Sequence, residues 1–281
     1  MLNRIRDVVV LNHRLDPVET ELGIHVLVET LTAGTELKGR LTGPRCVFSS
    51  TIEIAYPLRE LERTDHVELR VVIPEPSWWE PETPFLYVGV LELWQDGEFC
   101  QRAVISHGMR WLQLTSKGLH LNGTPFILRG KIVEPTLSDS AARMLREQGY
   151  NALFTTVADP CLELWSLADR VGFLVVGTAD KLATFLDCRN DLTAHPSTFG
   201  WTFNRAEIDQ APLQEEGLAM FYGINTSAKS RVGDAAFLVC EETELAWLDD
   251  AELPKLVITR SMPDPLPVRP DVIGWIESPT A

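Results

Sequence analysis

At Asn122-Gly123 the pattern of apolar residues along the chain changes. Before this point, short runs that alternate polar with apolar residues are separated by turn signals such as Asp96-Gly97, which is typical of antiparallel strands. After it, nearly continuous apolar runs alternate with helical stretches, which is typical of parallel strands covered on both faces. The sequence therefore predicts an antiparallel β-sandwich over residues 1–118 and an α/β domain over residues 119–281.

The first domain contains no convincing helical segment, and many short strands at this spacing favour a sandwich. Turns are expected at Thr32-Ala33-Gly34 and at Thr42-Gly43-Pro44, where glycine and proline break the pattern. The expected strands are Asp7–Leu11, Gly23–Leu31, Val47–Tyr56, His66–Ile73, Phe85–Trp94 and Cys100–Ser106.

The second domain contains eight short apolar runs, the number of strands in a (β/α)8 barrel. Helices are expected at Ser138–Gln148, Pro160–Val171 and Glu242–Asp249, since capping residues and glycine stops frame the first two. A full barrel takes ~250 residues, so residues 125–281 make either a shortened barrel or an open sheet. The expected strands are Phe126–Arg129, Ala152–Thr156, Phe173–Gly177, Thr198–Phe203, Ala219–Ile224, Ala236–Cys240, Lys255–Thr259 and Val272–Ile276.

The charge balance argues against two classes of partner. The chain of 281 residues carries a net charge of −15, from 25 basic and 40 acidic side chains. Such a field repels nucleic acid and anionic membrane surfaces. The basic start has no long apolar stretch behind it, and no window reaches the ~20 apolar residues of a membrane span. We therefore expect a cytoplasmic protein with no nucleic acid or membrane partner.

The five cysteines predict neither disulfides nor a metal site. Their number is odd, no CxxC pair occurs, and most lie in or beside apolar runs, as buried free thiols do in a reducing compartment. No cluster of Cys and His has the sequence spacing of metal ligands. A glycine-rich phosphate loop is absent as well. The sequence thus predicts no metal and no cofactor.

Several motifs occur in a familiar order. Trp78–Tyr87 carries tryptophans, a proline and Thr-Pro-x-Leu-Tyr, and Gly108-Met109-Arg110 follows it. Then come Leu121–Gly130, Gly149–Ala152 and Asp169–Val175. Together they resemble glycoside hydrolase family 2, the group of β-galactosidases, β-glucuronidases and β-mannosidases. The resemblance implies an immunoglobulin-like β-sandwich followed by a TIM-type (β/α)8 barrel, here shortened and degenerate.

The same resemblance implies where an acid/base glutamate should lie. Family members carry His-Pro-Ser, a tryptophan and then Asn-Glu along the fourth barrel strand. In this chain His195-Pro196-Ser197, Trp201 and Asn204 match, but Arg205 follows Asn204. A guanidinium is far too weak an acid to protonate a leaving group. Glu207 could replace the glutamate only through a shift of two residues.

A retaining glycosidase also needs a nucleophile, because it works with two carboxyl groups ~5 Å apart at the strand ends. The seventh expected strand ends in Thr259-Arg260-Ser261 and supplies none. Glu241 and Glu277, after the sixth and eighth strands, are the alternative candidates. Asp180, Trp201 and Asn204 are the residues expected to contact a sugar. The position of the family's pocket arginine holds Phe154.

Three hypotheses follow. The first is a pseudoenzyme on a family 2 framework, which binds carbohydrate or acts as a scaffold and does not hydrolyse sugars. The second is an active retaining β-glycosidase with relocated carboxylates. The third is a structural or oligomer-forming protein whose cleft is filled by side chains such as Phe154 and Phe203. The sequence does not specify the sugar or the oligomeric state.

Overall fold

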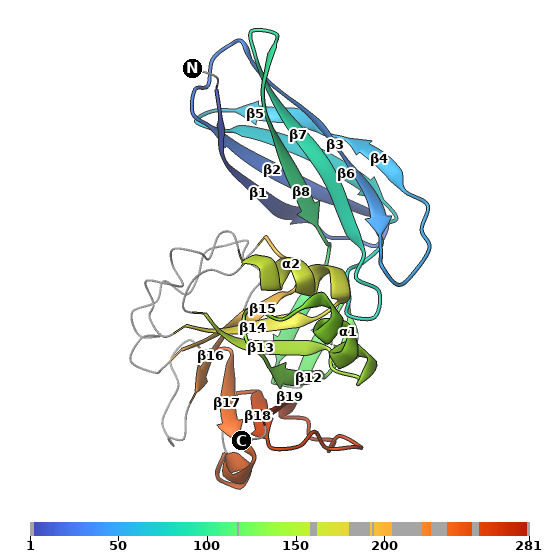
Figure 1. The fold of residues 1–281 in the computed structure, drawn as a ribbon, viewed down its shortest axis with the longest axis vertical. Coiled ribbons are helices and arrows are strands. Elements are labelled where there is room, and N and C mark those ends of the chain that lie inside the picture. Colours follow the sequence, from blue (N-terminus) through green and yellow to red (C-terminus); the bar gives the residue numbers. More distant parts are fainter. Residues whose placement is uncertain are drawn as a thin grey trace. The chain divides into compact units, whose positions relative to one another are not determined.

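The computed structural model describes residues 3–116, 118–157, 162–179, 192, 194–203, 221–225, 235–248 and 253–279. By its internal contacts the chain divides into two compact units. The first comprises Met1–Trp79 and Thr83–Arg110, and the second comprises Glu80–Glu82 and Trp111–Ala281. Figure 1 shows antiparallel strands in the first unit and a barrel of parallel strands in the second.

The first unit consists of two four-stranded antiparallel sheets, with strand orders β1-β2-β6-β5 and β4-β3-β7-β8. On β2, β6 and β7 alternate side chains are buried, as the period of two predicts. Its strands are β1 (Ile5–Arg14), β2 (Glu19–Val28), β3 (Thr35–Arg45), β4 (Ile54–Pro57), β5 (Arg59–Arg63), β6 (Val67–Pro74), β7 (Leu86–Gln95) and β8 (Glu98–His107).

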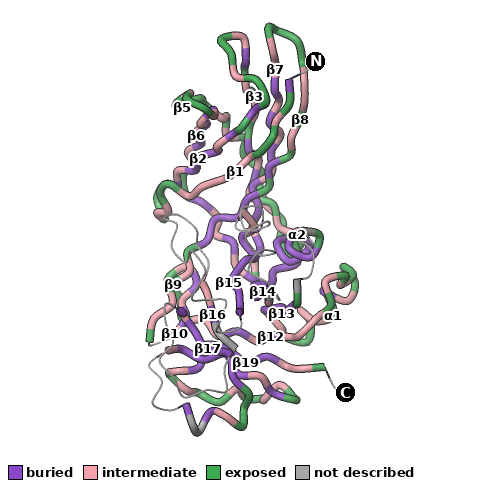
Figure 2. The backbone as a smooth tube through the Cα atoms, turned by 90° about the vertical axis from the view of Figure 1, so that its left-hand side faces the viewer, coloured by how far each residue is buried: buried purple, intermediate pink, exposed green. Residues whose placement is uncertain are grey.

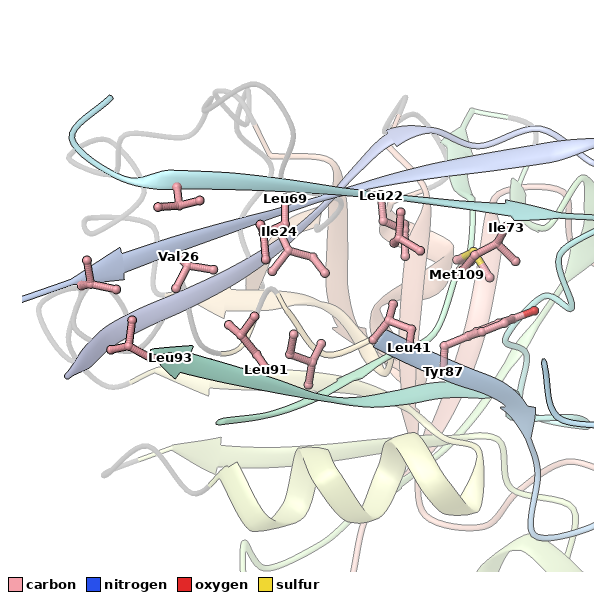
Figure 3. Packing of buried hydrophobic residues seen from close by; sticks show 14 residues of the cluster. Leu22, Ile24, Val26, Leu41, Leu69, Ile73, Tyr87, Leu91, Leu93 and Met109 are labelled. Atoms are coloured by element: carbon pink, nitrogen blue, oxygen red, sulfur yellow. The ribbon is translucent and has the colours of Figure 1, made fainter. Parts of the chain in front are cut away.

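The core of this unit is a layer of apolar side chains between the two sheets (Figure 3). Leu22, Ile24 and Val26 of β2 face Leu41 of β3 and Leu91 of β7, and all five are fully buried. The residues between them on β2 point outward. This alternation explains why β2 was recognisable from sequence.

Two expectations for the first unit are wrong. The expected turn at Thr42-Gly43-Pro44 lies inside β3, because pairing with β7 resumes at Arg45 opposite Leu86 after a local irregularity. The strand expected over Val47–Tyr56 begins only at Ile54. The alternation of Ser50 to Ala55 gave the wrong start, since Thr51 to Glu53 carry no strand and are largely exposed.

The second unit contains a closed barrel of eight parallel strands, β12 to β19 in chain order. A TIM-type barrel is therefore confirmed, and the open sheet is wrong. A three-stranded antiparallel sheet, β9-β10-β11, precedes it. The bounds are β9 (Leu112–Thr115), β10 (Gly118–Leu121), β11 (Thr124–Phe126), β12 (Leu128–Ile132), β13 (Ala152–Val157), β14 (Leu174–Ala179), β15 (Thr198–Phe203), β16 (Phe221–Asn225), β17 (Phe237–Glu241), β18 (Lys255–Thr259) and β19 (Val272–Glu277).

Two α-helices occur within the described residues, α1 (Asp139–Glu147) and α2 (Leu162–Val171). Ser138 caps α1 by accepting a hydrogen bond from the backbone N–H of Ala141, as its position before the helix predicted. The third expected helix forms a 3₁₀-helix instead, η1 (Glu242–Trp247). It follows β17 directly, and six residues leave no room for several α-helical turns.

The barrel wall has an inner and an outer layer of side chains. Outside, α2 packs on Leu153, Val175 and Trp201 in one buried cluster. Inside, a Cβ at Gly130 would contact the ring of Phe154 and the side chain of Ile276. Figure 2 shows β13, β14, β15, β17 and β19 buried along most of their length. The interior is thus a packed core.

Two further observations concern the whole described chain. No helix in the described residues combines the length and the apolarity needed to cross a membrane. Cys46, Cys100 and Cys240 are unbridged thiols; Cys240 is buried as expected, whereas Cys46 and Cys100 are half-buried, and Cys161 and Cys188 lie outside the described residues.

Candidate functional site

Two carboxylates lie on the barrel strands, and both are at strand ends where a barrel carries its chemistry. Glu241 is the last residue of β17 and Glu277 is the last residue of β19. The face of the wall to which each one points decides whether they can act together. Neighbouring residues of adjacent strands point to the same face, and successive residues of one strand point to opposite faces.

Glu241 points to the inner side of the wall. It pairs with Ile258 of β18, which pairs with Ile276 of β19, and Ile276 lies against Phe154 and Gly130 in the interior. Glu241 is exposed, and its backbone N–H donates to Glu244 Oε2 at 3.0 Å. It thereby marks the beginning of η1.

Glu277 points to the outer side. It follows the same alternation as Trp275, which packs with Leu245 and Leu248 around η1 outside the wall. Its Oε1 accepts from Lys131 Nζ at 2.5 Å, and its Oε2 accepts from Tyr150 Oη at 2.6 Å and from the backbone N–H of Met262 at 3.1 Å. Both carboxylate oxygens are therefore engaged on the outer surface of the barrel.

These contacts keep Glu277 ionised. Burial alone would raise its pKa, but the hydrogen bonds from Lys131 and Tyr150 outweigh burial and lower the pKa of Glu277 below its usual range. Burial and the bond to Glu277 raise the pKa of Tyr150 to about 12. A carboxylate held in this way is a poor proton donor at neutral pH, and it serves to join β12 to β19.

Replacing Glu277 by glutamine is expected to destabilise the protein by on the order of 1 kcal/mol at neutral pH, because charge-assisted bonds become neutral ones. Since the folded pKa is lowered, the stabilisation is present above the unfolded value of ~4.3 and is lost as pH falls through the folded value. Urea unfolding at pH 7 and below pH 4 measures this. The control is Glu241→Gln, because Glu241 is exposed. An equal loss of unfolding free energy in both variants would contradict the stabilising role of the Glu277 contacts.

Trp201, expected to contact a sugar, is fully buried. Its ring stacks on that of Trp165 in α2, with centroids 6.0 Å apart and an interplanar angle of 11°. A local irregularity between Thr198 and Gly200 places it on the outer face, opposite Gly177, whose Cβ would meet the indole at 2.8 Å. In this position the ring contacts helix α2 and presents no face to solvent.

His195 and Ser197 of the His-Pro-Ser motif are tied to α2 by Asp169. Asp169 Oδ2 lies 2.5 Å from His195 Nδ1, and its Oδ1 accepts from the backbone N–H of Ser197 at 3.0 Å. Ser197 Oγ donates to the carbonyl of Trp165 at 3.3 Å. Asp169 is almost fully buried. The motif therefore fixes the beginning of β15 against α2.

The inner face near the strand ends carries both apolar and polar side chains. Phe154, which stands at the family's arginine position, is 7% exposed and lies beside Gly130. The hydroxyls of Thr178 and Thr202 lie 2.7 Å apart on this face. Sequence reasoning missed this pair, although both residues continue the inward alternation of their strands. Hydroxyls and one exposed carboxylate can bind a polar ligand, but two facing carboxyls are needed for retaining hydrolysis.

Asp180, Asn204, Arg205 and Glu207 lie outside the described residues. Phe203, proposed to fill the cleft, is instead buried in the outer cluster with α2.

No protein-family model matches the chain. It is 24% identical over 204 residues to the β-galactosidase BoGH2A of Bacteroides ovatus, which corresponds to 59% of this chain and 24% of that enzyme. A β-galactosidase of Klebsiella pneumoniae is 24% identical over 127 residues, which correspond to 41% of this chain and 12% of that protein. The chain thus spans about a quarter or less of these relatives.

Solved structures extend the likeness to nearly the whole chain. A glycosyl hydrolase family 2 member from Bacteroides cellulosilyticus superposes with a TM-score of 0.70 at 17% identity, covering 98% of this chain and 46% of that one. At such identity the likeness establishes the fold. Together with the sequence matches, it identifies the chain as a glycoside hydrolase family 2-like protein, shorter than the relatives that it matches.

Proposed function

We propose that this chain is a pseudoenzyme that keeps a family 2 framework without glycosidase activity and acts in carbohydrate binding or scaffolding. The two antiparallel sheets serve, in this proposal, as the immunoglobulin-like sandwich over residues 1–118, and residues 119–281 form the barrel domain. The relatives named above are β-galactosidases, so a β-linked sugar is the ligand class to test first. The cytoplasmic location stays a prediction.

The observation that carries the proposal is the opposite orientation of Glu241 and Glu277. One points to the inner side of the wall and the other to the outer side, where Lys131 and Tyr150 hold it. A retaining pair must face one sugar from ~5 Å apart, and carboxylates on opposite sides of a strand wall do not. The seventh strand, β18, ends at Thr259 without a carboxylate.

The sequence after β15 supports the same conclusion. Arg205 occupies the position after Asn204 at which the family's acid/base glutamate is expected. The guanidinium stays protonated throughout the physiological range and cannot cycle a proton. Phe154 also supports the loss of activity. Its ring lies inside the barrel beside Gly130, at the position where the family has a pocket arginine.

The test is turnover of a panel of chromogenic β-glycosides by the purified chain, beside an Arg205→Glu variant. We expect no turnover by either protein, because restoring one carboxyl leaves the nucleophile missing. Binding is followed on the same preparations by titration with unlabelled β-galactosides. A Glu241→Gln variant is the matched control, since Glu241 is the inward carboxylate on the described strands.

The outcomes separate the hypotheses. Turnover by the wild type that Glu241→Gln or Glu207→Gln abolishes would show an active glycosidase and overturn the proposal. Saturable binding without turnover supports a carbohydrate-binding role. Absence of both supports scaffolding, the role that a packed interior with Phe154 favours.

A further inference from the structure

Three potential metal ligands from three strands meet on the outer face of the first sheet. They are His13 of β1, His25 of β2 and Glu68 of β6. His25 and Glu68 are direct cross-strand partners. The residues that flank His25 on β2, Ile24 and Val26, point into the core, so the imidazole must point away from it. The three residues are far apart in the sequence, so the spacing of possible ligands along the chain does not reveal the cluster.

The separations suit one shared cation. His13 Nε2 lies 3.6 Å and His25 Nε2 lies 3.8 Å from Glu68 Oε1, and the three ligand atoms lie within 4.8 Å of one another. These distances are too long for hydrogen bonds. Ligands bound tetrahedrally to zinc at ~2.0–2.2 Å lie ~3.4 Å apart. Small side-chain rotations would therefore bring all three into coordination.

The nitrogen that would bind is otherwise unused. His25 Nε2 is buried and has no hydrogen-bond partner in the structure, which is uncommon for a buried polar atom. A buried ring nitrogen without a hydrogen-bond partner is an atom that a bound ion would satisfy.

An irregularity in the backbone of β1 positions the His13 ring. Pairing of β1 with β2 shifts between Asn12 and Arg14, which makes His13 the extra residue of a bulge, and bulges re-aim side chains. The ring then lies directly over Gly23 of β2, where an added Cβ would be 2.4 Å from Nε2. A glycine at this position is what leaves room for the imidazole beside Glu68.

One carboxylate lies near the second nitrogen of His13, on the side where carboxylates commonly orient metal-binding imidazoles. Glu21 Oε1 is 4.0 Å from His13 Nδ1, and Glu21 Oε2 accepts from Arg70 Nη2 at 2.5 Å. His66, whose ring centroid is 4.8 Å from that of His25, is itself bound to Asp65 at 2.7 Å. His66 therefore belongs to the surroundings of the site and is outside the ligand set.

We propose that His13, His25 and Glu68 bind a divalent transition-metal ion, with zinc favoured, and that the ion ties β1, β2 and β6 together. Two imidazoles with one carboxylate suit zinc and its neighbours in the first transition row, whereas calcium and magnesium prefer oxygen ligands. Three protein ligands leave a fourth position for water. The site lies in the first unit and is independent of the barrel and its chemistry.

The test uses the full chain, stripped with a chelator and titrated calorimetrically with Zn²⁺ alone. We expect one ion per chain and a melting temperature that rises with free zinc, because the ion binds the folded state. His25→Gln and Glu68→Gln should each weaken binding at least ~10-fold. Co²⁺ should give the intense visible absorption of a four-coordinate site.

Gly23→Ala is the sharpest variant, since it keeps every ligand but displaces the His13 ring. The displaced atoms are the far end of a flexible side chain, so the fold should tolerate the change while zinc affinity falls. His120→Gln, in β10 of the second unit, is the control. Binding that is absent or unsaturable in the wild type, or unchanged in both Gly23→Ala and His25→Gln, would overturn the proposal.

Discussion

Replacing Trp201 by alanine is expected to lower the free energy of unfolding by about 3–5 kcal/mol, the range for a buried tryptophan. The indole is fully buried, stacks on Trp165 and lies in the cluster that joins α2 to the barrel. Its removal leaves a cavity that the rigid strands cannot close. Denaturant unfolding followed by far-UV circular dichroism measures the loss without depending on tryptophan fluorescence.

The matched control is Trp111→Ala. Trp111 belongs to the same unit but is 52% exposed, so we expect less than about 1 kcal/mol of destabilisation. The comparison also separates packing from ligand contact. If Trp201 served a sugar, its replacement would weaken binding and leave the unfolding midpoint unchanged, which would contradict its placement against α2.

Replacing Asp271 by asparagine is expected to cost about 2–3 kcal/mol at pH 7, at the lower end for breaking a buried ion pair because Asp271 is partly exposed. Its Oδ2 lies 3.0 Å from Nζ of Lys255, whose side chain is fully buried at the beginning of β18, and 3.1 Å from Arg269 Nη2. The variant leaves a buried ammonium group without this carboxylate. Urea unfolding measures the difference.

The pH dependence gives this prediction a second check. Burial would raise the pKa of Asp271, but hydrogen bonds from Arg269 and Lys255 lower it to about 2. A lowered folded pKa means that the stabilisation is present above the unfolded value of ~3.9 and is lost as pH falls toward 2. Wild type and Asp271→Asn should therefore converge in that window.

Two variants control for other causes. Exposed Asp264→Asn should change stability little at any pH. The double variant Lys255→Met/Asp271→Asn should recover much of the loss, because an apolar side chain removes the buried charge. If the double variant is as unstable as Asp271→Asn, the cost arises from backbone strain near β19 and the ion-pair explanation is wrong.

Periodicity located all eight barrel strands because each is a short apolar run between breakers, and their order in the barrel follows chain order. It erred by about two residues at the first, where hairpin strand β11 precedes β12. In the first unit β3 was not among the expected strands, because glycines and polar residues interrupt its apolar pattern. β3 is a strand because it pairs with β7 along its length. The local sequence of β3 does not show which other strand it will pair with.

The site was less predictable than the fold. The face on which Trp201 lies depends on an irregularity beside Thr198, and one extra residue in a strand reverses every side chain after it. Glu277 was correctly placed at a strand end, but its partners Lys131 and Tyr150 are far away in the chain. Ion pairs between distant segments depend on tertiary structure, so composition and spacing do not show them.

The pairing of β12 with β19 has a consequence for how the protein is made. The salt bridge between these strands joins residues that are 146 positions apart. At ~5–20 residues per second, a ribosome needs about 7–30 s to synthesise that span. During this time the nascent first strand has one edge with no strand to pair, and such edges invite pairing with other chains. Efficient biosynthesis therefore depends on shielding this edge until the last strand emerges.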